Sequence, residues 1–115
     1  MGRLYKPVEV SSDDNTILTI GLVDTGADDT VISEKLANEL GVKLYGEYKA
    51  TCASQYILKG KQALIKIKDK RDNKEIEIVV GVSDIPFDTD EVDEEGVGVI
   101  LGTDFIQKTN LLNLN

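Results

Sequence analysis

Histidine is absent from the 115-residue chain, and cysteine occurs only once, as Cys52. Without an imidazole to activate a Ser or Cys nucleophile, histidine-dependent triads and acid/base relays are excluded. The usual mixed cysteine and histidine zinc sites are excluded as well, and one cysteine cannot form an internal disulfide. The sequence therefore predicts no metal and no cofactor, and chemistry is sought among its carboxylates.

The chain also lacks long apolar runs and an excess of positive charge. No stretch approaches the roughly 18 apolar residues of a membrane span, and the start, MGRLYKPVEV, has no apolar segment followed by a cleavage site. We therefore expect a cytoplasmic protein with no membrane partner. The net charge of −8 argues against nucleic acid as a partner. Basic residues do gather between Lys59 and Lys74, but they alternate with apolar residues and include no aromatics, which favours a strand with one solvated face.

The length fits one domain, and the patterning favours strands over helices. Strands are predicted at 16–23, 44–50, 55–67, 75–82 and 97–101, with the first and last of these buried. A short helix follows Ser33 and ends at Gly41, and a second helical stretch opens at Gly102. The segment from Asp84 to Glu95 contains seven carboxylates and is expected to be a solvated loop. We therefore expect residues 1–115 to form a single, mainly β domain.

The stretch VDTGADDTV at 23–31 follows an apolar strand and has three interpretations. In the structural one it is a tight turn in which Asp28, Asp29 and Thr30 cap the start of a helix. In the second, Asp24, Asp28 and Asp29 bind magnesium, although the glycine-lysine sequence that cradles phosphate is missing. In the third, Asp24 is catalytic.

The catalytic interpretation needs two carboxylates. Two Asp side chains within about 3 Å of each other cannot both ionise and share one proton, as in aspartic proteases. The ionised carboxylate then takes a proton from water while the protonated one polarises a peptide carbonyl. Such a pair hydrolyses amides without metal, cysteine or histidine, which suits this composition.

VDTGADDTV resembles the active-site segment of the retropepsins, the retroviral-type aspartic proteases, and DTGADDTV is identical to the segment of well-known members. Weaker similarity covers most of the chain: VILG at 99–102, residues 50–67, which resemble the flap hairpin and the strand leaving it, Lys6-Pro7 before the first core strand, and the closing NLLNLN, which resembles the dimerisation strand. The resemblance implies an all-β closed barrel, the acid protease fold, with one short α-helix near the C-terminus and a flap hairpin. Because the chain has one DTG, it also implies a homodimeric aspartic endopeptidase with one Asp24 from each chain.

The resemblance also implies roles for individual residues. Asp24 is the catalytic acid or base, Thr25 locks the paired loops across the dimer axis, and Gly26 lets the backbone approach a peptide substrate. The residues expected to bind that substrate are Ala27, Asp28 and Asp29 in the cleft, Thr51, Cys52, Ala53 and Ser54 at the flap tip, and Val97 and Ile100 as apolar pocket walls.

Two departures from the family pattern bear on function. The flap tip has no glycine, so we expect it to be stiffer than retroviral flaps. After Gly102 the family has an Arg that pairs with the Asp corresponding to Asp28, whereas this chain has Thr103-Asp104. Asp28 then needs another partner, for which Lys6 of the same or the other chain is the candidate. The alternative to an enzyme is a retropepsin-like module for dimerisation or peptide binding, with little or no proteolysis.

Overall fold

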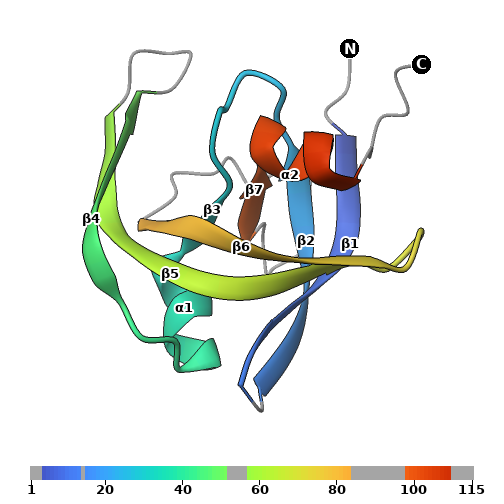
Figure 1. The fold of residues 1–115 in the computed structure, drawn as a ribbon, viewed down its shortest axis with the longest axis horizontal. Helices are drawn as coiled ribbons and strands as arrows, with labels where there is room; N and C mark the ends of the chain where they lie inside the picture. The colour runs from blue at the N-terminus through green and yellow to red at the C-terminus, as the bar shows by residue number, and fades with distance from the viewer. Residues whose placement is uncertain (1–3, 14, 52–56, 84–97, 110–115) are drawn as a thin grey trace.

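The computed structural model describes residues 4–13, 15–51, 57–83 and 98–109 (Figure 1). Strands dominate the chain, with one short helix in its first half and one at its end. In chain order the elements are β1 (Leu4–Ser12), β2 (Asn15–Val23), β3 (Val31–Ser33), α1 (Glu34–Leu40), β4 (Tyr45–Thr51), β5 (Ile57–Asp69), β6 (Lys74–Ser83), β7 (Val99–Leu101) and α2 (Thr103–Thr109).

The strands form one sheet that closes on itself. Their order is β1-β2-β7-β3-β6-β5-β4, and an additional antiparallel pairing of β1 with β5 completes a ring of six strands. Within the described residues β4 lies outside this ring and pairs with β5, so the two strands extend from the barrel as a hairpin (Figure 1). The all-β closed barrel with a short helix near the C-terminus is therefore confirmed.

The core is built by alternation along β5 and β6. On β5, Ala63, Ile65 and Ile67 are buried, and Ile65 lies opposite the buried Ile78 of β6. Burying a side chain of this size contributes roughly 1.5 to 3 kcal/mol, so this face holds the barrel together.

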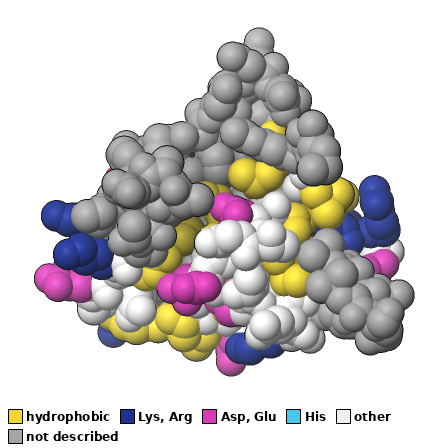
Figure 2. All heavy atoms as spheres, turned by 90° about the horizontal axis from the view of Figure 1, so that it is seen from above, with side chains coloured by type: hydrophobic (Ala, Val, Ile, Leu, Met, Phe, Trp, Pro, Cys, Tyr) yellow, Lys and Arg dark blue, Asp and Glu magenta, His cyan; other side chains and the backbone are white. Residues whose placement is uncertain are grey.

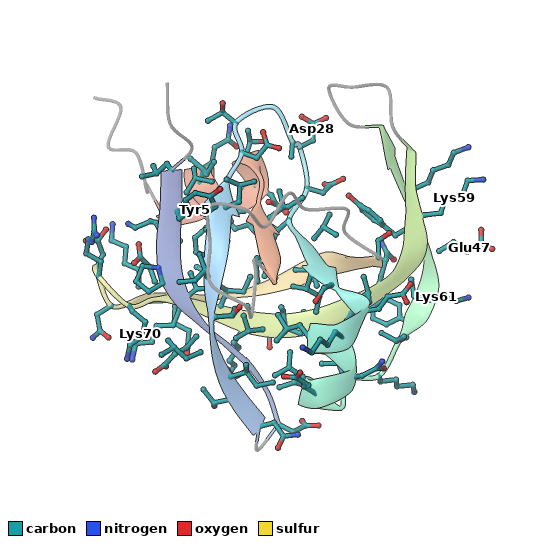
Figure 3. The ribbon with its side chains drawn as sticks, turned by 180° about the vertical axis from the view of Figure 1, so that it is seen from behind. Tyr5, Asp28, Glu47, Lys59, Lys61 and Lys70 are labelled. Carbon is teal, nitrogen blue, oxygen red and sulfur yellow. The ribbon has the colours of Figure 1, made fainter. Side chains whose placement is uncertain are left out.

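The basic side chains of the β5 region are distributed over a solvated surface. Lys66 lies opposite Glu77 and Lys68 opposite Glu75, so acidic partners stand across the ladder. Lys59 and Lys61 extend from the β4–β5 hairpin, far from Lys70 at the other end of β5 (Figure 3). The predicted strand with a solvated face is confirmed.

Helix α1 has the ends that the sequence predicts. The Ser33 hydroxyl oxygen accepts a hydrogen bond from the Leu36 N–H at 3.0 Å, and Gly41 ends the helix with φ 71°. The interpretation in which Asp28 to Thr30 cap this helix is wrong, because Val31–Ser33 intervenes as strand β3 between β6 and β7.

The N-terminal strands differ from expectation in two respects. Strand β2 was predicted to be buried, but only Gly21 is, where Leu101 packs against it, and Leu18 is 62% exposed. Strand β2 therefore carries apolar side chains on both faces, and the described residues do not cover all of them. Lys6 and Pro7 precede the strand expected at 16–23, but they lie within β1, a strand that the sequence did not predict.

One end of the barrel gathers the elements that carry the DTG motif. The β2–β3 loop, α2 and the outer end of the β4–β5 hairpin lie at this end, while α1 and the β1–β2 turn lie at the other (Figure 1). Neither described helix, each seven residues long, could cross a bilayer. The predicted loop 84–95 and the closing segment NLLNLN at 110–115, expected to be the dimerisation strand, lie outside the described residues.

Candidate active site

Asp24 is the first residue beyond strand β2. Its N–H donates to the Leu101 carbonyl at 3.0 Å, which continues the parallel pairing of Val23 with Leu101. Asp24 is half-buried. The carboxylate therefore emerges from a position that two strands of the barrel fix.

The turn after Asp24 is closed by hydrogen bonds to that residue. The Gly26 N–H donates to Asp24 Oδ1 at 2.9 Å, and the Ala27 N–H donates to the Asp24 carbonyl at 3.1 Å. A Cβ at position 26 would lie 3.3 Å from Asp24 Oδ1, so glycine keeps the approach to the carboxylate open. Thr25 and Gly26 are exposed.

The residues that follow β7 form hydrogen bonds to the backbone of the DTG loop. The Thr103 N–H donates to the Ala27 carbonyl at 2.8 Å, and the Asp28 carbonyl accepts from the Thr103 hydroxyl and the Asp104 N–H, both at 3.3 Å. A Cβ at Gly102 would lie 2.5 Å from the Asp29 carbonyl oxygen. The two segments are thus in close contact, which explains why glycine occupies position 102.

Thr30 and Asp104 form a polar contact that the sequence did not predict as part of the site. Thr30 is fully buried, and its hydroxyl donates to Asp104 Oδ1 at 2.7 Å while its N–H donates to Asp104 Oδ2 at 3.2 Å. The Thr30 hydroxyl also accepts from the Gly102 N–H at 3.1 Å. The sequence did offer a hint, because Thr103-Asp104 follow Gly102 where the family has an Arg. On sequence alone, that departure indicates only the loss of the Arg, and not the gain of a carboxylate.

Asp28 and Asp29 are exposed, and Asp28 projects outward from the loop (Figure 3). Although Asp29 is exposed as a residue, its carboxyl is partly shielded from water by the neighbouring loop atoms, and this desolvation raises its pKa; the charges of Asp104 and Asp28 raise it further. Figure 2 looks down on this end and shows carboxylates near its centre with apolar side chains around them. The face is therefore acidic at its middle.

The expected pairing of Asp28 with Lys6 of the same chain is wrong, because Lys6 pairs with Asp69. Lys6 Nζ lies 2.7 Å from Asp69 Oδ2, and the two side chains are 8% and 1% exposed. Since Lys6 is engaged by the β5–β6 turn, it is withdrawn from the loop that carries Asp28. Thr103, which stands where the family has its Arg, contacts the Ala27 and Asp28 carbonyls and not the Asp28 carboxylate.

A cavity of about 330 Å³ lies beside this loop. Asp29, Tyr48 and Gly81 line it together with parts of β4, β5 and β6. A Cβ at Gly81 would lie 2.6 Å from the Tyr48 ring, so this glycine admits the ring against β6. The cavity offers space for a substrate side chain next to the DTG loop.

The other predicted site residues are only partly described. Ile100 is half-buried on β7, opposite Leu22 and Val31. Thr51 ends β4, where its backbone pairs with Ile57. Cys52, Ala53 and Ser54 of the flap tip, and Val97, lie outside the described residues. Among the residues that are described, no three His, Cys, Asp or Glu side chains are grouped to hold a metal ion.

Comparison with known proteins agrees with this architecture. The sequence profile of the aspartyl protease family matches residues 8–105, which span the barrel and both segments of the site. No curated protein matches the chain.

Solved structures with the same fold include viral and cellular proteins. The EIAV protease complexed with the inhibitor HBY-793 is 24% identical with a TM-score of 0.66, covering 95% of this chain and 89% of that one. The foamy viral protease-reverse transcriptase is 24% identical with a TM-score of 0.58, and 92% of this chain matches 12% of that longer chain. The retroviral protease-like domain of Ddi1 from Leishmania major is 14% identical with a TM-score of 0.56, covering 96% of this chain and 77% of that one. Together with the family match and the DTG loop at the end of β2, these likenesses establish that the chain is a retropepsin-like member of the aspartyl protease family.

Proposed function

We propose that the protein is a homodimeric aspartic endopeptidase in which one Asp24 from each protomer activates the hydrolytic water. The observation that carries the proposal is the placement of Asp24: it is half-buried at the end of a barrel strand, with its amide bound to Leu101 and its carboxylate bound to the Gly26 N–H. A carboxylate held this way does not need to reorganise during the reaction, which is what electrostatic catalysis requires.

The chemistry follows from two such carboxylates that share one proton. The ionised Asp24 removes a proton from water as the water oxygen attacks the peptide carbonyl carbon. The protonated Asp24 of the partner subunit donates its proton to the carbonyl oxygen. When the tetrahedral intermediate collapses, the C–N bond breaks, the leaving nitrogen takes a proton from the first carboxylic acid, and one hydroxyl of the intermediate returns its proton to the Asp24 carboxylate of the partner subunit, which restores the shared proton.

The second carboxylate has to come from a second copy of the chain. The sequence contains one DTG, and an isologous contact across a two-fold axis brings identical loops together. Thr25 is exposed beside Asp24, where it is available for that contact. The closing segment NLLNLN at 110–115 remains a prediction for the rest of the interface.

The substrate is proposed to be an extended peptide held between the DTG loop and the β4–β5 hairpin, which acts as the flap. Ala27, Asp28 and Asp29 would bind the peptide backbone, and Ile100 would form an apolar wall. The cavity beside Asp29 and Tyr48 supports this placement because it opens next to the loop. The roles of the flap tip at 51–54 and of Val97 remain predictions.

The test compares wild type with Asp24→Asn on a random peptide library between about pH 4 and pH 7, the range in which a shared-proton pair is active. Asp13→Asn is the matched control, because Asp13 is an exposed carboxylate at the β1–β2 turn whose φ of 51° Asn tolerates. We expect cleavage by wild type and Asp13→Asn that pepstatin inhibits and a chelator does not affect, and none by Asp24→Asn. Size-exclusion chromatography should show that wild type, Asp13→Asn and Asp24→Asn are all dimers.

Other outcomes point elsewhere. Equal cleavage by wild type and Asp24→Asn would refute the mechanism. An intact wild-type dimer that binds peptides without cleaving them would favour the peptide-binding module, and loss of cleavage with a chelator would favour a magnesium hydrolase.

A further inference from the structure

Asp104 is a carboxylate that the catalytic scheme does not use, yet it has three hydrogen-bond donors. Its Oδ1 accepts from the Thr30 hydroxyl and from the Phe105 N–H, both at 2.7 Å, and its Oδ2 accepts from the Thr30 N–H at 3.2 Å. Two of these three donors belong to a residue 74 positions earlier in the chain. Only the bond from the Phe105 N–H is local to the first turn of α2.

Thr30 is the point at which the DTG loop rejoins the barrel. It is fully buried, its carbonyl accepts from the Gly81 N–H at 3.0 Å, and its hydroxyl accepts from the Gly102 N–H. The start of the loop is fixed in the same way by the bond from the Asp24 N–H to Leu101. The loop is therefore held at both ends, and at its far end one acidic side chain accepts from both the N–H and the hydroxyl of Thr30.

We propose that Asp104 is a positioning residue that acts through Thr30 to hold the loop 24–30 in the geometry in which the two Asp24 carboxylates meet. The proposal rests on the proposed function, because it assigns this carboxylate a part in the same reaction. Asp104 does not touch the reacting atoms; it sets where they lie.

A carboxylate suits this role better than an amide. Both oxygens of Asp104 accept, and bonds to an ionised acceptor are shorter and stronger than neutral ones. In an Asn, one oxygen becomes an NH₂ group that cannot accept. In one orientation the bond from the Thr30 N–H is lost. In the other the NH₂ group can only donate to the Thr30 hydroxyl, which reverses that bond, and the bond from the Phe105 N–H is lost. The charge of Asp104 also reaches the cleft, since it contributes, after burial, to the raised pKa of Asp29.

The variants are Asp104→Asn and Thr30→Val, with Thr30→Ser as the conservative change that keeps the hydroxyl. Ile106→Val is the control for general destabilisation, because Ile106 is buried on the same helix and its change removes only a methylene. For each dimer at equal concentration, kcat, KM and amide hydrogen exchange at residues 24–30 are measured well below the unfolding temperature.

We expect kcat of Asp104→Asn and Thr30→Val to fall by roughly 10- to 100-fold, as for a displacement of catalytic groups by about an ångström, with KM changed by less than about threefold. Exchange at 24–30 should accelerate in both variants, and Thr30→Ser should restore both readouts toward wild type. The pKa of Asp29, followed by carboxyl carbon NMR, should fall in Asp104→Asn because a neighbouring negative charge is gone.

The hydrogen-exchange measurement tests the positioning role of Asp104 even if the wild type cleaves no peptide. In that case the proposed endopeptidase fails, while faster exchange in Asp104→Asn than in Ile106→Val would still support the positioning role. Unchanged exchange, or a kcat that falls no further than in Ile106→Val, would overturn it.

Discussion

The buried ion pair between Lys6 and Asp69 gives the sharpest test of the fold. Its atoms are 2.7 Å apart, and the two side chains are 8% and 1% exposed. Replacing Lys6 by Met keeps the length of the side chain and removes the charge. The Asp69 carboxylate is then left buried without a cation, which costs about 3 to 5 kcal/mol when one partner of such a pair is lost.

The other hydrogen bonds of Asp69 decide where in the range of about 3 to 5 kcal/mol the cost of Lys6→Met falls. Its Oδ1 accepts from the Arg71 N–H at 2.9 Å and from the Asp72 N–H at 3.4 Å, and neither depends on Lys6. These bonds continue to stabilise the carboxylate, so we expect the lower end, about 3 kcal/mol.

The matched control is the exposed pair of Lys70 with Glu9. Its atoms are 2.8 Å apart, but the side chains are 41% and 29% exposed, so Lys70→Met should cost about 0 to 1 kcal/mol. Urea unfolding at pH 7 measures both variants at one protein concentration, because the proposed dimerisation would contribute to apparent stability. A Lys6→Met variant no less stable than Lys70→Met would refute the reasoning. A variant that unfolds like wild type but dimerises poorly would favour a contact of Lys6 with the partner subunit.

Three further predictions concern pH and two local contacts. Burial tends to raise the pKa of Asp69, but the hydrogen bond from Lys6 and the backbone donors outweigh it and hold the pKa below its usual value. The ion pair should therefore stabilise the fold fully above the unfolded-state pKa of about 3.9, and this stabilisation should be lost as pH falls through the lower folded-state pKa. In urea unfolding, the wild type should be more stable than Asp69→Asn at about pH 6, and the difference between them should shrink toward about pH 2. Gly102→Ala places a Cβ 2.5 Å from the Asp29 carbonyl oxygen, and the resulting backbone shift should cost about 1 to 3 kcal/mol and at least about tenfold in kcat, measured by urea unfolding and peptide cleavage. Ser33→Ala removes the acceptor at the start of α1 and should cost about 1 kcal/mol in the same unfolding assay with kcat unchanged.

Local patterns predicted the parts of the fold that depend on neighbours in sequence. Ser33 and Gly41 delimit α1 because capping needs only residues within one turn. The solvated face of β5 was readable because side chains alternate along a strand. The DTG turn was also predictable, since its hydrogen bonds join residues two or three apart.

Contacts between distant residues left no such pattern. Lys6 and Asp69 are 63 positions apart, and no periodicity says that this lysine points toward the β5–β6 turn rather than the DTG loop. Strand β3 is three residues long, too short for an alternating signal, so the sequence alone favours a helix cap for the acidic residues before it. Thr30 and Asp104 meet because β3 and β7 are neighbours in the sheet, which only the topology determines.

The central claim is that each active unit needs an Asp24 from both protomers, and mixed dimers test it most directly. Wild type and Asp24→Asn are unfolded together in varying ratios, refolded and assayed at constant total dimer. If both carboxylates are required, activity should fall as the square of the wild-type fraction, to about a quarter in an equal mixture. If one Asp24 sufficed, mixed dimers would be fully active and an equal mixture would keep about three-quarters of the activity; that result, or a linear fall to about half, would contradict the account.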